Sequence, residues 1–217
     1  MPAVKVFCDF DGTISSIDIG NYIFTHYAKE RNFDLIKLWK ENKMSSRKLM
    51  IEECKIVNFT LDEVLKLIRD LEIDSTFLEF YRILIKNNIP VTILSDGLDF
   101  YIQYFLKKYN IEEIPFRANT AEFTGDGTVI PDFPYFEQGC GKCGNCKGGH
   151  LKKEEKGSFV VYIGDGYSDR CAAPHADIIF AKKDFAKYCK EQKIPFILFE
   201  NFDDVLSVLI EKNIIQK

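Results

Sequence analysis

Hydrophobic residues follow two different periods along the chain, and the change of period divides it into segments. A short β-rich run, Val4-Lys5-Val6, predicts a first strand. From Ser16 to about Leu71 apolar residues recur at helical spacing, which predicts a group of about four helices. Thr60-Leu61-Asp62-Glu63 has the pattern of a capping box that would begin the last helix, and Ser45 is placed to cap the one before.

Strands and helices alternate after this helical group. A helix from about Ser75 to Lys86 precedes the apolar strand Val91–Leu94, and a helix from Phe100 to Lys108 follows it. The last third repeats the alternation: strand 159–163, helix from 168, strand 177–181, helix 185–191, strand 195–199 and helix 203–212. The strand runs are continuously apolar, as in strands buried on both faces. This order predicts an α/β protein built on a doubly wound parallel sheet.

One part of the chain departs from the alternation. Residues 116–123 and 128–130 flank Gly125-Asp126-Gly127, which predicts a small β-hairpin. Residues 131–149 are rich in glycine, and we predict an irregular stretch there. We therefore predict a core formed by residues 1–14 and 75–217, with residues 15–74 inserted as a separate helical domain.

Composition limits the classes of function. The 217 residues are 46% hydrophobic with a formal net charge of −4, which indicates a globular chain. Because Lys and Arg form no long run, nucleic acid is not expected as a partner. The first strand follows Met1 too closely for a signal sequence, and no apolar run approaches about 18 residues, so we expect a cytoplasmic protein that does not interact with membranes.

Acidic and polar side chains follow three of the predicted strands. The first strand ends in Asp9-Phe10-Asp11-Gly12-Thr13, the second in Ser95-Asp96-Gly97, and a later one is followed by Asp165 and Asp169. Taken alone, the first stretch is equally consistent with an ordinary strand-to-loop turn. Ligands of parallel α/β sheets bind outside the carboxyl ends of the strands, so we expect the three loops at one edge.

These residue types suit phosphoryl transfer, in which catalysis consists mainly of positioning and charge neutralisation. A set of carboxylate ligands without histidine favours Mg²⁺. A carboxylate nucleophile that forms an aspartyl-phosphate is one available route.

Four stretches resemble, in order, the motifs of the haloacid dehalogenase (HAD) superfamily: Asp9-Phe10-Asp11-Gly12-Thr13, Leu94-Ser95-Asp96-Gly97, Lys147, and Gly164-Asp165-Gly166-Tyr167-Ser168-Asp169. The resemblance implies a Rossmann-like core and a phosphatase. It implies that Asp9 is the nucleophile and Asp11 the general acid and base, that Ser95 and the Gly97 amide hold the phosphoryl group, and that Lys147 neutralises its charge. It also implies Mg²⁺ on Asp9, on the Asp11 carbonyl and on Asp165, with Asp169 in support.

The helical insert resembles the C1-type cap of the phosphoserine phosphatase-like branch of this superfamily. In that branch an acid nine residues after the nucleophile and an arginine of the cap contact the substrate, and the matching positions are Asp18 and Arg47. Phosphoserine phosphatases have glutamate where this chain has Asp18, which argues against phosphoserine itself. The resemblance implies a small phosphate ester enclosed by a lid that excludes water.

Three of the seven cysteines, Cys140, Cys143 and Cys146, lie within seven residues directly before Lys147. The odd total suits reduced thiols or a metal better than a disulfide framework. A structural Zn²⁺ held by these thiols with His150 or another nearby thiol is one interpretation, and free thiols in a glycine loop are the other. The loop is similar to that of two groups of relatives, the methionine-salvage phosphatases of hydroxyketo-methylthiopentenyl phosphate and the phosphoethanolamine/phosphocholine phosphatases; we favour the first.

Two non-enzymatic alternatives share parts of this pattern. A response-regulator receiver domain also places acids, a hydroxyl and a lysine around Mg²⁺, but at about 120 residues it is shorter and needs no helical insert. An inactive HAD module used only for binding would be expected to lack one of the first two aspartates, and this chain has both. The sequence leaves the oligomeric state open.

Overall fold

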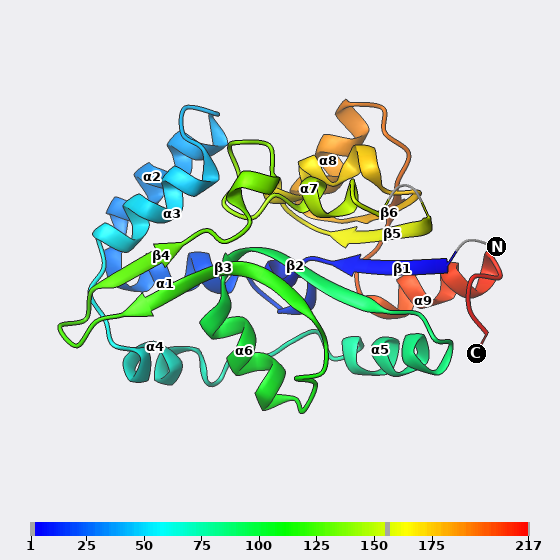
Figure 1. Cartoon of the computed structure of the whole chain (residues 1–217), viewed down its shortest axis with the longest axis horizontal. Helices are drawn as coiled ribbons and strands as arrows, with labels where there is room; N and C mark the ends of the chain where they lie inside the picture. The colour runs from blue at the N-terminus through cyan, green and yellow to red at the C-terminus, as the bar shows by residue number, and fades with distance from the viewer. Residues whose placement is uncertain (1–2, 155–156, 217) are drawn as a thin grey trace.

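A computed structural model describes residues 3–154 and 157–216. Seven strands form one sheet in the order β4-β3-β2-β1-β5-β6-β7 (Figure 1). Their bounds are β1 (Ala3–Cys8), β2 (Val91–Leu98), β3 (Phe116–Phe123), β4 (Val129–Asp132), β5 (Ser158–Gly164), β6 (Ile178–Ala181) and β7 (Ile197–Leu198). Every neighbouring pair is parallel except β3 and β4. The predicted doubly wound α/β fold is confirmed.

The helices are α1 (Ile19–Ala28), α2 (Glu30–Lys40), α3 (Ser46–Lys55), α4 (Leu61–Ile68), α5 (Phe77–Lys86), α6 (Asp99–Lys108), α7 (Lys147–Leu151), α8 (Lys183–Glu191) and α9 (Phe202–Glu211). Short helical turns cover η1 (Phe10–Ile14), η2 (Phe136–Gln138), η3 (Tyr167–Cys171) and η4 (Ala173–His175). Among the described residues, none of these helices is long and apolar enough to cross a membrane.

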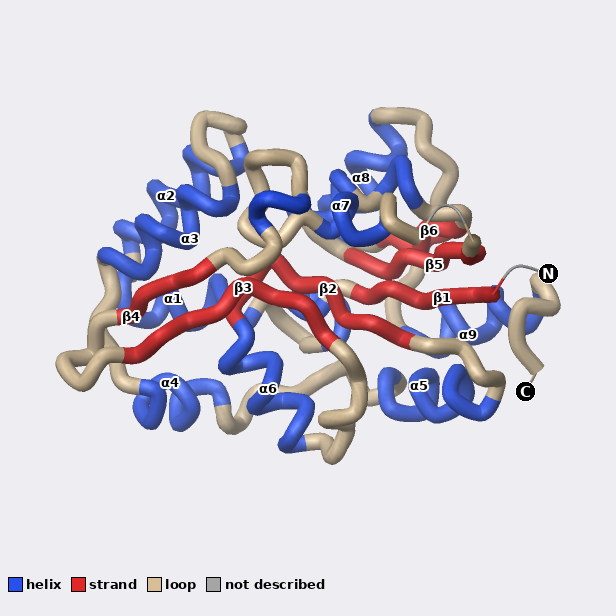
Figure 2. Tube along the Cα trace, viewed as in Figure 1, coloured by secondary structure: helices blue, strands red, loops and turns tan. Residues whose placement is uncertain are grey.

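Helices cover both faces of the sheet (Figure 2). Successive residues of a strand point to opposite faces. In β1, Val6 and Cys8 join the core beneath α5, α6 and α9, whereas Phe7 joins the core beneath α7 and α8. Burial of one such apolar side chain contributes about 1.5–3 kcal/mol to the free energy of folding. The two-sided burial explains why the strand runs are continuously apolar, and it holds the end of β1 firmly in place.

Helices α1 to α4 fall within residues 15–74, and α2 and α3 lie beside β4 at one end of the sheet (Figure 1). The residues predicted to cap two of these helices do so. The Ser45 side chain accepts a hydrogen bond from the Lys48 amide, and Thr60 and Glu63 form a complete capping box. Phe59, just before α4, contacts Tyr27 of α1 and Phe123 of β3, so the helical group packs against the hairpin.

The structure departs from the sequence prediction in three places. The predicted hairpin is present, but β3 also pairs with β2, so the hairpin extends the main sheet. The helix expected from Ser168 is instead the two short turns η3 and η4, because Pro174 lacks the amide that a continuing helix would need. The irregular stretch 131–149 contains the end of β4, the turn η2 and the start of α7.

Candidate active site

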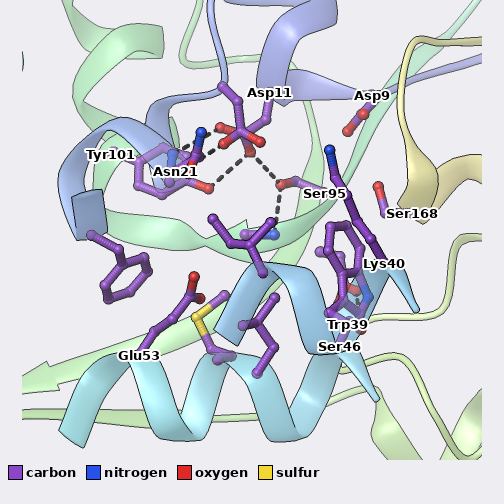
Figure 3. Close-up of a pocket in the computed structure, with 18 residues that line it drawn as sticks. Asp9, Asp11, Asn21, Trp39, Lys40, Ser46, Glu53, Ser95, Tyr101 and Ser168 are labelled. Carbon is purple, nitrogen blue, oxygen red and sulfur yellow. Dashed lines mark hydrogen bonds between the residues drawn. The ribbon is translucent and has the colours of Figure 1, made fainter. Parts of the chain in front are cut away.

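The candidate site lies at the carboxyl ends of β1, β2 and β5. Strand β1 lies between β2 and β5. Strands β2, β3 and β4 follow one another on one side of β1, and β5, β6 and β7 on the other, so this is the topological switch point of the sheet. A pocket opens there between the strand ends and helices α1, α2 and α3 (Figure 3). The three predicted polar stretches therefore do meet at one edge, although Ser95-Asp96-Gly97 lies within β2 and not in a loop after it.

Three buried carboxylates, those of Asp9, Asp165 and Asp169, have oxygens within 4.8 Å of one another. Burial raises the pKa of Asp9, and the negative charges of Asp169 and Asp165 raise it further. The positive charge of Lys147 lowers this pKa but does not cancel the increase. Burial and the charge of Asp169 also raise the pKa of Asp165. Such crowding favours a bound cation. A cluster of hard oxygen donors without nitrogen or sulfur fits Mg²⁺, and Asp9 and Asp165 are the two residues with carboxylates placed to hold it.

Lys147 is the cation of this cluster and is only 1% exposed. Its Nζ lies 2.7 Å from Asp9 Oδ1 and 2.6 Å from Asp169 Oδ1, and it donates to Ser168 Oγ at 2.9 Å. The two carboxylates raise the pKa of Lys147 against the effect of burial, so the amine stays charged. Of the four lysines near the cysteines in sequence, Lys147 is thus the one at the acid cluster.

Asp169 organises the loop after β5. Its Oδ2 accepts hydrogen bonds from the amides of Asp165 and Gly166 at 2.9 and 2.8 Å, and its Oδ1 accepts one from the Tyr162 hydroxyl. These amides are therefore not free to bind a phosphate, because Asp169 already occupies them. Its role here is to orient Asp165 and Lys147.

The Asp11 side chain points away from the acid cluster. Its Oδ1 accepts from the amides of Ile19 and Gly20 at the start of α1, and its Oδ2 accepts from Ser95 Oγ at 3.1 Å and from the Tyr101 hydroxyl at 2.8 Å. Burial, followed by the charge of Asp18, raises the pKa of Asp11 to about 7. A carboxyl with that pKa can both donate and accept a proton near neutral pH.

Tyr101, which contacts Asp11, and Lys183, which contacts Asp165, were missed by the sequence reasoning. Tyr101 lies on α6, and its hydroxyl lies so close to Gly97 that a Cβ there would be 1.6 Å away, so only glycine fits. Lys183 donates to Asp165 Oδ2 at 2.8 Å and to the Gly12 carbonyl at 3.0 Å. Lys183 follows the end of β6, so the rule that strand ends meet at one edge could have found it, whereas Tyr101 left no signal in the sequence.

The predicted cap residues divide into two groups. Asp18 lines the pocket and caps α1 by accepting from the Asn21 amide at 2.8 Å. Arg47 does not line it: its guanidinium lies over the rings of Phe133 and Phe136, 5.1 and 4.2 Å from their centroids. The prediction that Arg47 faces the pocket is therefore wrong for this conformation, because two aromatic rings outside the pocket hold it.

Two further charged residues of segment 15–74 line the pocket. Lys40, at the end of α2, extends toward Asp9 and Ser168, and Glu53 rises from α3 into the cavity (Figure 3). Glu53 is 5% exposed, and its carboxyl group forms no hydrogen bond or ion pair within residues 3–154 and 157–216. Burial, followed by the charge of Asp18, raises the pKa of Glu53 well above its ordinary value. Burial therefore favours the neutral form of this carboxyl group, which lies at the end of the pocket away from the acid cluster (Figure 3).

The sequence left open whether His150 or another nearby thiol joins the three cysteines of the loop. The thiols of Cys140, Cys143 and Cys146 come together, and the fourth group beside them is the thiol of Cys171. His150 points elsewhere: its Nδ1 lies 2.9 Å from Arg117 Nη1, and its Nε2 lies 2.5 Å from Asn145 Oδ1. Burial, followed by the positive charge of Arg117, lowers the pKa of His150 to about 4, which keeps the ring neutral.

Comparison with known proteins agrees with this geometry. The family described as "Putative Phosphatase" matches residues 4–198. The 2-hydroxy-3-keto-5-methylthiopentenyl-1-phosphate phosphatases of Bacillus mycoides (strain KBAB4) and Bacillus cereus (strain B4264) are each 31% identical to this chain. The alignments cover 95% and 96% of this chain, and 96% and 98% of those relatives.

Solved structures share the fold at lower sequence identity. A phosphoserine phosphatase structure described as a phospho-aspartyl intermediate analogue superposes with a TM-score of 0.74 and 18% identity, over 96% of this chain and 99% of that one. A cytosolic 5'-nucleotidase IIIB bound to cytidine superposes with a TM-score of 0.60 and 16% identity, over 96% of this chain and 84% of that one.

Proposed function

Because the chain belongs to the "Putative Phosphatase" family and its motifs resemble those of the HAD superfamily, we propose that it is a Mg²⁺-dependent phosphomonoesterase that acts through an aspartyl-phosphate on Asp9. The observation that carries this proposal is the placement of two aspartates with opposite surroundings. Asp9 lies among carboxylates and beside the charged Lys147, whereas Asp11 has hydrogen-bonding partners and a pKa of about 7. Such a pair provides a nucleophile and an acid in one site.

The proposed reaction has two steps. Asp9 attacks phosphorus and the ester bond to the leaving oxygen breaks, while Asp11 donates its proton to that oxygen. Asp11 then accepts a proton from water, which attacks phosphorus and releases phosphate and free Asp9. Bound Mg²⁺ would neutralise the charge of the phosphoryl oxygens. Lys147 would add a fixed positive charge. The Gly97 amide donates to the Ser95 hydroxyl at 2.9 Å in the structure, and these two groups would hold the phosphoryl group.

We propose that residues 15–74 form a cap over this site, as expected from their position in the chain. In this arrangement Lys40 takes the place that the sequence reasoning assigned to Arg47, since it is the basic cap residue that lines the pocket. A lid of this kind leaves room for a small phosphate ester and excludes water during the reaction.

The pocket lining favours a particular class of ester. Its phosphate end is polar, whereas Phe24, Leu49 and Met50 make the far end apolar, with the carboxyl group of Glu53 among them. A substrate with a short apolar chain and one neutral hydroxyl or carbonyl oxygen would fit this lining. We propose 2-hydroxy-3-keto-5-methylthiopentenyl-1-phosphate, for which the Bacillus relatives are named. Phosphocholine or phosphoethanolamine is the alternative, in which an ionised Glu53 would face a cation.

The first test is phosphate release from a panel of small phosphomonoesters. Protein freed of metal should be inactive and should regain turnover when Mg²⁺ alone is added, because the three carboxylates need a divalent cation between them. We expect the methylthiopentenyl phosphate to have the highest kcat/KM. Turnover that is equal with and without Mg²⁺, or no turnover of any ester, would contradict the proposed function.

Variants of Glu53 distinguish the two substrate classes. If Glu53 hydrogen-bonds a neutral oxygen, Glu53→Gln should keep kcat/KM for the methylthiopentenyl phosphate within roughly fivefold, whereas Glu53→Leu should lower it by roughly 10- to 100-fold. If the substrate is cationic, both variants should lose activity equally. The exposed Glu30→Gln on α2 is the matched control, and p-nitrophenyl phosphate should be hydrolysed equally well by all variants.

A further inference from the structure

Four thiols converge beside the active site from two separate segments: Cys140, Cys143, Cys146 and Cys171. Their sulfur atoms all lie within 4.8 Å of one another, and none forms a disulfide. We propose that these four cysteines bind one Zn²⁺ in a tetrahedral site that fixes the position of Lys147. The role assigned to Lys147 rests on the proposed phosphatase function, whereas the metal site itself does not.

The spacing of the sulfur atoms matches a zinc tetrahedron. A Zn–S bond of about 2.3 Å places the ligand sulfurs of a tetrahedral site about 3.8 Å apart. The sulfurs of Cys140 and Cys143 are 3.5 Å apart, and those of Cys143 and Cys171 are 3.9 Å apart. A disulfide would need about 2.05 Å. The thiols thus lie at the separation of ligands that share a metal.

The surroundings of Cys146 stabilise a thiolate. The thiols of Cys143 and Cys171 and the backbone amides of Gly149 and Cys140 all form hydrogen bonds with the Cys146 sulfur. Cysteine binds zinc as the thiolate, and amide donors around a ligand sulfur reduce the cost of holding its charge. Lys142 and Arg170 line the cavity next to the cluster and add positive charge close to it.

Cys171 takes the fourth place because His150 is fully engaged. The Arg117 guanidinium can only donate, so His150 Nδ1 accepts from it and His150 Nε2 donates to Asn145 Oδ1. Asn145 in turn donates to the backbone carbonyls of Ser95 and Arg117 at 2.8 and 2.7 Å. His150 therefore anchors the loop to β2 and β3, and it has no free nitrogen for a metal.

The proposed metal would join the two segments that position the active-site cation. Cys146 directly precedes Lys147, and Cys171 follows Asp169 by two residues. Lys147 Nζ lies 2.6 Å from Asp169 Oδ1. The segments also touch through their backbones, since a Cβ on Gly148 would lie 2.0 Å from the Cys171 carbonyl oxygen. Ordering a glycine-rich loop costs conformational entropy, which metal binding would offset.

The test measures metal content and does not depend on turnover. The full chain purified without chelator should contain about one zinc per chain, and apo protein titrated with Co²⁺ should show the absorption of a tetrahedral thiolate site. Cys171→Ser should weaken zinc binding by more than about tenfold, whereas His150→Asn should still bind zinc. Cys189→Ser, which removes a buried thiol outside the cluster, is the matched control.

Different outcomes separate the possible roles of the cluster. If His150→Asn loses zinc and Cys171→Ser keeps it, the ligand set is wrong. If the wild type binds neither Zn²⁺ nor Co²⁺, or if its mass is lower by two hydrogens because a disulfide has formed, the metal site is refuted. Circular dichroism of each variant shows whether a loss of metal reflects unfolding, and the Co²⁺ titration of wild-type apo protein needs no variant. Zinc binding without phosphatase activity would support this site while refuting the proposed function.

Discussion

Asp9→Asn is expected to abolish phosphate release, lowering kcat by roughly four orders of magnitude or more, because the amide cannot form the aspartyl-phosphate. The replacement keeps the shape of the side chain and removes one of three crowded buried charges. We therefore expect the thermal unfolding midpoint to stay the same or rise, since functional charges at such sites reduce stability.

The matched control for this experiment is Asp126→Asn. Asp126 lies in the exposed turn between β3 and β4, in a Gly-Asp-Gly sequence like that around Asp165, and it should not affect turnover. Steady-state assays of both variants with Mg²⁺, together with mass spectrometry of the acid-quenched wild type, provide the measurements. Wild-type turnover in Asp9→Asn would rule out the proposed nucleophile.

Lys147→Met is expected to reduce both activity and stability. Removal of one positively charged contact to the transition state costs roughly 10²- to 10³-fold in kcat. The same change leaves Asp9 and Asp169 without their buried cation, and breaking such a pair costs about 3 kcal/mol or more of unfolding free energy.

Added Mg²⁺ should restore part of the stability of Lys147→Met without restoring its turnover, because the metal can neutralise the carboxylates but cannot replace the amine. Denaturant unfolding with and without Mg²⁺ measures the first effect, and phosphate release measures the second. Lys152→Met, an exposed lysine of the same segment, should behave as wild type. If both lysine variants keep full activity, the cation of the site is a different residue.

The order of the elements could be predicted from sequence because it depends on local signals. Apolar periods, the Ser45 and Thr60 caps and the Gly-Asp-Gly turn each act over a few residues, and the structure reproduces them. The meeting of Asp9, Ser95 and Asp165 also followed from a general rule, that the carboxyl ends of parallel strands share one edge. The observed ends of helices and strands differ from the predicted ends where a tertiary contact or a proline changes the local structure.

Contacts between distant segments could not be predicted in this way. Arg47 has the residue type and position of a substrate ligand, yet two aromatic rings outside the pocket hold it. Cys171 lies far along the chain from the other three cysteines, and only the fold brings its thiol to them. Glu53 looks in sequence like any charged residue on a helix surface. What sets it apart is its burial and lack of a partner, which only the assembled pocket reveals.

The central position of β1 has a consequence for how the chain folds. Val6 pairs with Val91 on one side and with Val161 on the other, so the strand that ends at Asp9 is completed only by contacts of very high sequence separation. Topologies dominated by such contacts fold slowly, and a growing chain emerges from the ribosome N-terminus first. The edge of β1 that β5 will cover, with its unpaired backbone amides and carbonyls, therefore stays open to chaperones, or to misassociation, until synthesis has passed residue 164.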